Sequence, residues 1–116
     1  MSARILFPGS NIALKTPAYL VEQTERFYRD VVGLRPAGSR RSYQFGEMTI
    51  WLDEVPGLSQ PEAWLELQTA DLDRARAHLA DHGIAAEPVE DLPPGYQGFW
   101  CRSPSGLVHL VSLEGE

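Results

Sequence analysis

The stretch Asn-Ile-Ala-Leu-Lys-Thr at residues 11–16 decides the fold, because the chain repeats its pattern 53 residues later as Trp-Leu-Glu-Leu-Gln-Thr at residues 64–69. Each stretch alternates between two faces, as a half-buried strand does. Each is followed by a helical spacing of apolar residues that ends at a glycine, Gly33 in the first copy and Gly83 in the second. The sequence therefore predicts one strand-helix unit built twice.

Three more strands are expected after each helix. In the first copy they begin at Leu34 and continue as a hairpin, 42–45 and 48–53, around Gly46-Glu47. In the second copy they cover residues 84–89, 97–102 and 107–113.

The predicted fold is α+β. Two tandem βαβββ modules form a curved mixed sheet with a central cup, and the helices lie on its outer face. The chain is expected to be one domain over 1–116, with module one at 1–54, a proline-containing linker at 55–62 and module two at 63–116.

Composition excludes several classes of function. The chain has 116 residues, 43% of them hydrophobic, which suffices for one globular core without disulfides. Its net charge of -6 and its scattered basic residues disfavour nucleic acid, and no apolar run is long enough to span a membrane. With a single cysteine, Cys101, the chain fits a reducing cytoplasm.

The first helix closes with Phe-Tyr-Arg-Asp-Val-Val-Gly-Leu at residues 27–34, and Ser-Pro-Ser-Gly at residues 103–106 precedes the last strand. With these motifs and the repeated element order, the chain resembles the vicinal oxygen chelate superfamily. That group includes glyoxalase I, bleomycin-resistance proteins, fosfomycin-resistance transferases and extradiol dioxygenases. The resemblance covers essentially the whole chain and implies the two-module fold, usually assembled as a homodimer.

Enzymes of that superfamily hold a metal ion with four ligands, typically His and Glu, on inward strand faces. The corresponding positions here are Asn11, Trp51, Trp64 and either His109 or Leu110, because the turn before the last strand leaves its register open by one residue. An indole nitrogen offers only a donor hydrogen. We therefore expect no metal and no other cofactor, with a divalent metal ion as the alternative.

Two residues near these positions remain candidates for catalysis. Glu66 lies two residues after Trp64 on the same strand face, and His109 is expected to face the same cup if Val108 and Leu110 cover the helix side. His78 and His82 have half the spacing of a zinc site on a helix, but no third ligand stands nearby in sequence, which favours a solvated helix face.

Large aromatic residues stand where the family's enzymes hold metal, which suggests a cavity that grips an organic molecule by stacking. Large core residues that fill a site which no longer binds anything would give the same pattern. The predicted ligand-binding residues are Asn11, Lys15, Trp51, Trp64, Glu66, Trp100 and His109.

The first hypothesis is a metal-independent protein that binds a drug-like molecule or metabolite, resembling the bleomycin-resistance branch. The second is a metal-dependent lyase, isomerase or dioxygenase that recruits Glu66 and His109. A metal-free enzyme with His109 or Glu66 as general base stands between them. All three predict a small-molecule partner.

Overall fold

The computed structural model describes residues 4–116, which divide into two compact units. The first unit is Ser10–Trp64, and the second is Leu65–Glu116 together with the residues up to Gly9. The division into module one at 1–54, a linker at 55–62 and module two at 63–116 stays a prediction. That the whole chain forms a single domain with a central cup stays a prediction.

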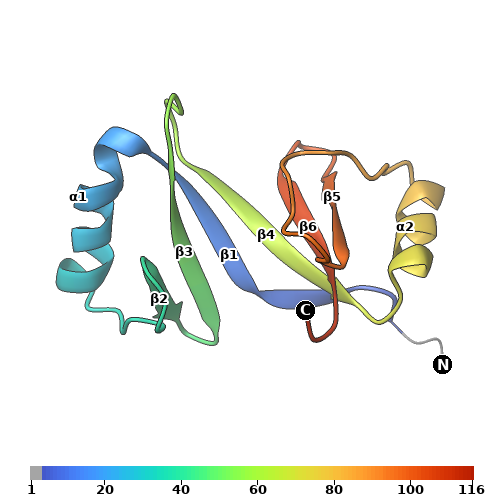
Figure 1. The fold of residues 1–116 in the computed structure, drawn as a ribbon, viewed down its shortest axis with the longest axis horizontal. Coiled ribbons are helices and arrows are strands. Elements are labelled where there is room, and N and C mark those ends of the chain that lie inside the picture. Colours follow the sequence, from blue (N-terminus) through green and yellow to red (C-terminus); the bar gives the residue numbers. More distant parts are fainter. Residues whose placement is uncertain (1–3) are drawn as a thin grey trace. The chain divides into compact units, whose positions relative to one another are not determined.

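The first unit has a three-stranded mixed sheet with helical segments beside it (Figure 1). Strand β1 runs parallel to β3, and β2 runs antiparallel to β3. The elements are β1 (Phe7–Pro17), the 3-10 turn η1 (Ala18–Leu20), α1 (Val21–Arg26), the π-helical turn η2 (Phe27–Val31), β2 (Ser42–Phe45) and β3 (Met48–Val55).

The core of the first unit follows the predicted alternation of its strands. Ile50 and Leu52 of β3 are buried with Tyr43 of β2, and Ile12 and Leu14 of β1 pack against them. Ile12 pairs with Ile50 and Leu14 pairs with Leu52, so these side chains share one face of the sheet. The alternation that the sequence predicts for residues 11–16 is therefore confirmed.

The predicted helix over residues 18–32 is divided into three types of turn. A 3-10 turn opens it, six α-helical residues follow, and the π-helical turn η2 closes it before Gly33, whose φ is 81°. A π turn takes more residues than an α turn, so the apolar stripe rotates away from the sheet. Tyr28 still packs on the core, whereas Phe27 and Val31 are exposed.

The second unit repeats the arrangement with a more regular helix. Strand β4 is parallel to β6, β5 is antiparallel to β6, and Figure 1 shows α2 beside them. The bounds are β4 (Glu62–Thr69), α2 (Leu72–Asp81), β5 (Gly98–Arg102) and β6 (Val108–Leu113). Asp71 caps α2, because its carboxylate accepts the N–H of Arg74 at 3.1 Å. The α+β class is confirmed.

The helices of residues 4–116 are all short. The longest, α2, has ten residues. None in this part of the chain is long and apolar enough to cross a membrane.

The strands predicted to begin at Leu34 and to cover residues 84–89 are wrong, because the described segments 32–41 and 82–97 contain no β-strand. Pro36 forms an isolated bridge with Tyr43, and the N–H of Glu87 donates to the carbonyl of Trp100 at 2.9 Å. Pro36 and Pro88 lie within these segments, and proline has no N–H to donate to a ladder. Regular pairing therefore does not continue there.

A buried tyrosine joins β2 to α1. The Tyr43 hydroxyl donates to Oε2 of Glu25 at 2.8 Å, and Tyr43 is 4% exposed. Burial raises the pKa of Tyr43 above its usual value, and the hydrogen bond to the Glu25 carboxylate raises it further. The neutral phenol is therefore the form that the folded state stabilises.

Replacing Tyr43 by Phe should lower the free energy of unfolding at pH 7 by about 1 kcal/mol, because one hydrogen bond is lost. The unfolded tyrosine ionises near its usual pKa of 10.0. The stabilisation is thus present below that pH and is lost as pH rises through and above it. Urea unfolding between pH 7 and 11 should show a shallower decline for Tyr43→Phe. Tyr19→Phe, at a site 74% exposed, is the control, and equal slopes in all three proteins would contradict the assignment.

Candidate functional site

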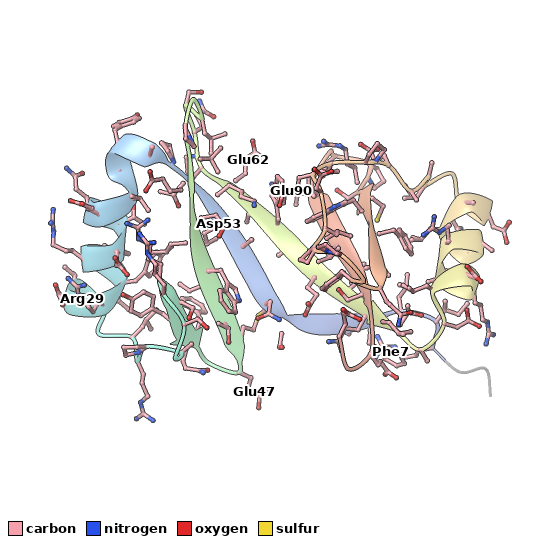
Figure 2. All side chains as sticks on the ribbon, viewed as in Figure 1. Phe7, Arg29, Glu47, Asp53, Glu62 and Glu90 are labelled. Atoms are coloured by element: carbon pink, nitrogen blue, oxygen red, sulfur yellow. The ribbon has the colours of Figure 1, made fainter. Side chains whose placement is uncertain are left out.

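Polar and aromatic side chains gather on the face of the first unit's sheet that lies opposite α1. Asn11 and Lys15 alternate with the core residues of β1, and Trp51 and Asp53 alternate with those of β3. Lys15 pairs directly with Asp53 across the two strands, and Figure 2 labels Asp53 on β3. The prediction that Trp51 avoids the helix-packed core is confirmed.

The indole of Trp51 is held by its neighbour on β1. Its Nε1–H donates to Oδ1 of Asn11 at 2.8 Å. Trp51 is half-buried, so part of its ring remains accessible to solvent. This bond fixes the ring on the sheet face and leaves a flat apolar surface there.

Lys15 forms a second cluster on the same unit, with one acidic and one aromatic partner. Its Nζ donates to Oδ2 of Asp53 at 2.9 Å and lies 4.0 Å from the centroid of the Trp64 ring. The Lys15 side chain is only 9% exposed, whereas that of Asp53 is 43% exposed. Both contacts offset the loss of hydration of the Lys15 ammonium, which is largely removed from water. Asp53 keeps one carboxylate side open to solvent.

Sequence reasoning did not assign a role to Glu62, the residue that orients Trp64. The Trp64 Nε1–H donates to Oε1 of Glu62 at 3.0 Å. Both residues belong to β4 and are two positions apart, and residues at that spacing share a strand face. The same alternation that placed Trp64 was therefore the signal that could have found Glu62.

In the second unit, the register of β6 places Leu110, and not His109, on the same side of the sheet as Glu66. Leu110 pairs with Glu66 of β4, and His109 pairs with Leu65. Val111 is fully buried against Ala75 of α2, which places the His109 side on the helix-packed face. The expectation that His109 faces the same side as Glu66 is wrong. It rested on the apolar character of Val108 and Leu110, but both faces of this strand are apolar.

His109 and Glu66 therefore do not form an acid-base pair on one surface. Nδ1 of His109 lies 3.0 Å from the carbonyl oxygen of Leu107, two residues earlier in the chain. Glu66 packs across Gly9, where a Cβ atom would lie only 2.8 Å from the Glu66 Cβ. Gly9 leaves the space that the Glu66 side chain occupies. Their roles in catalysis stay predictions.

Trp100 lies on the Glu66 side of the second unit but is covered. It pairs with Leu110 across β5 and β6, and it is 8% exposed. Its Nε1–H donates to the carbonyl of Glu90 at 2.9 Å, so the loop before β5 covers the ring. That Trp100 and Glu66 line a ligand site together with Trp51 and Trp64 stays a prediction.

The candidate metal-binding groups do not assemble within residues 4–116. His78 and His82 share a face of α2, with ring centroids 4.9 Å apart, as their spacing predicted. No group of three or more His, Cys, Asp or Glu side chains gathers in this described range. Burial also raises the pKa of the Cys101 thiol, which makes it a poor thiolate ligand.

Comparison of the sequence with protein-family models and with curated proteins gives no match.

Solved structures, in contrast, match at the level of the fold. The Mn(II)-bound glyoxalase from Novosphingobium aromaticivorans matches with a TM-score of 0.61 and 23% identity, over 95% of this chain and 40% of that one. Homoprotocatechuate 2,3-dioxygenase from Arthrobacter globiformis gives 0.63 and 16%, over 97% and 37%. A glyoxalase/bleomycin resistance protein/dioxygenase superfamily member from Vibrio splendidus 12B01 gives 0.61 and 13%, over 89% and 97%. This chain has the vicinal oxygen chelate fold. It spans about two fifths of the glyoxalase and of the dioxygenase.

The prediction that no cofactor is involved is wrong. Solved proteins with the vicinal oxygen chelate fold include a glyoxalase with bound Mn(II), and these neighbours point to a divalent ion. The prediction rested on the residues at four strand positions only. The residues at those four positions do not determine whether other residues of a protein with this fold bind an ion.

The four predicted ligand positions themselves do not fit a metal ion. Asn11 already accepts the Trp51 N–H, and the indoles of Trp51 and Trp64 have no lone pair to give. The fourth position is Leu110, which has no donor atom at all. No metal-dependent step is derived from these side chains.

Replacing Asp53 by Asn should reduce the free energy of unfolding by about 1–3 kcal/mol, because the buried Lys15 ammonium loses a charged acceptor. The matched control is Glu47→Gln, which removes one negative charge from an exposed position in the hairpin of the same unit. Urea unfolding at pH 7 measures both. Equal stability of the two variants would show that Lys15 does not need Asp53.

Proposed function

We propose that this protein binds a planar organic molecule on the face of the first unit's sheet opposite α1. The observation that carries the proposal is the pair of oriented indoles, Trp51 held by Asn11 and Trp64 held by Glu62. Two aromatic rings fixed by hydrogen bonds offer flat surface at little further cost in conformational entropy. Assembly as a homodimer and a cytoplasmic location stay predictions of the sequence.

The charges on this face suggest which polar groups the ligand carries. The cation of Lys15 is occupied by Asp53 and by the Trp64 ring, and its side chain is nearly buried. The exposed part of the Asp53 carboxylate accepts hydrogen bonds. A planar ligand that carries hydrogen-bond donors or a positive charge therefore complements this surface better than a carboxylate does.

Titration with a panel of cationic aromatic compounds should change the intrinsic tryptophan fluorescence in a saturable way. Replacing Trp51 by Leu should weaken the binding of the best compound roughly tenfold, because one stacking surface is lost. Tyr19→Leu is the control, since Tyr19 is exposed on η1. A panel with no saturable change, or equal affinity for the Trp51→Leu variant, would rule out this site.

A second candidate function is a divalent-metal-dependent lyase, isomerase or dioxygenase. It is supported by the glyoxalase with Mn(II) and by the dioxygenase that share the fold. Glu66 is the described residue best suited to hold such an ion, because it is the carboxylate beside the predicted ligand positions. An ion held there would act as a Lewis acid on a bound substrate.

The second function predicts that protein purified without chelators carries a stoichiometric divalent metal, and that Glu66→Gln loses most of it. Elemental analysis of both proteins after dialysis measures the content. Glu90→Gln, which alters an exposed acidic residue of the same unit, should keep the metal. Absence of metal, or equal content in the Glu66→Gln variant, would contradict the metal-dependent function.

A further inference from the structure

A separate cavity lies on the other face of the first unit's sheet, between β1 and the helical segment. Its volume is about 370 Å³, within the range of small-molecule sites. Leu14 and Pro17 form its β1 side, and Leu20 and Tyr28 form its helical side. Leu14 belongs to the α1-facing side of the sheet, so the cavity is distinct from the surface that carries Trp51.

The two threonine hydroxyl groups of this cavity are already committed as donors. Thr24 Oγ1 donates to the carbonyl of Leu20 at 2.8 Å, and Thr16 Oγ1 donates to the carbonyl of Leu14 at 3.0 Å. A hydroxyl has one hydrogen and two lone pairs, so both groups can only accept from a ligand. These two threonines therefore favour a ligand that donates hydrogen bonds.

The charged side chain in the lining also favours a ligand that donates hydrogen bonds. Of the nine residues that line the cavity, Glu62 is the charged one, and none is Lys, Arg or His. One oxygen of its carboxylate is held by the Trp64 N–H, which orients the group at the cavity edge. A negative charge with no neighbouring cation in the lining repels carboxylates and phosphates and attracts an ammonium.

We propose that this cavity binds a primary amine with an apolar body. The apolar part fills the space against Leu14, Pro17 and Leu20, and the ammonium group reaches the Glu62 carboxylate at the edge. The proposed site shares Glu62 with the function proposed for the opposite face, where Glu62 orients Trp64. It requires neither Trp51 nor a metal ion.

The test uses 4-phenylbutylamine and its uncharged counterpart 4-phenylbutan-1-ol, each titrated into the whole protein labelled with 15N. The amine should cause saturable shifts of the backbone N–H signals of residues 16, 20, 24 and 63. The alcohol should bind at least about fivefold more weakly, because it lacks the charge-assisted hydrogen bond. Equal affinity for both compounds would overturn the assignment to amines.

Two variants locate the amine. Glu62→Gln should weaken amine binding at least about fivefold, whereas Glu47→Gln should leave the affinity for the amine unchanged. Glu62 is the first residue of β4 and Glu47 lies in the hairpin before β3, well apart in Figure 2, so the pair separates a local contact from a change in net charge. Equal weakening by both variants would reduce the effect to general electrostatic attraction and overturn the site.

Ala63→Leu should fill the cavity and abolish the shifts while a urea unfolding curve shows that the protein stays folded. The Trp51→Leu variant separates this proposal from the function proposed above. It should bind the amine with unchanged affinity. Loss of amine binding in Trp51→Leu, or saturable shifts confined to residues of the opposite face, would overturn the proposed cavity site.

Discussion

The parallel pairing of β1 with β3 in one register is the constraint on which the rest of the first unit depends. Ile12 opposite Ile50 and Leu14 opposite Leu52 give an apolar face that packs against the helical segment. Because side chains alternate along a strand, the residues between these apolar positions must then lie on the other face of the sheet. A slip by one residue would bury Asp53 and Lys15 beneath the helix, at a cost of roughly several kcal/mol if they lost their partners.

That face uses its polar groups to orient aromatic rings. Asn11 and Glu62 each accept an indole N–H, and Lys15 lies over the Trp64 ring while it donates to Asp53. Each contact satisfies a polar atom that would otherwise lose water without a replacement. The result is a rigid and partly apolar surface on which hydrogen bonds orient the aromatic rings.

The second unit has the same element order but a different balance between its faces. Val111, Phe99 and Cys101 are buried against α2, yet Trp100 and Val108 on the opposite side are also buried. When both faces of a strand are apolar, hydrophobic alternation no longer indicates which side faces the helix. His109 and Leu110 exchange their expected roles for this reason, and Glu66 is left without an imidazole on its own face.

The sequence by itself determined the duplicated strand-helix pattern, the hairpin at Gly46, the cap at Asp71 and the outward direction of Trp51. These features depend on short-range rules: alternation, turn geometry and capping. Only the tertiary structure decided the register of β6, the π-helical turn at the end of the first helix, the contact of Lys15 with Trp64 and the cavity beside Glu62. Those depend on how strands pair and how side chains from distant positions pack, and no local pattern in the sequence specifies that packing.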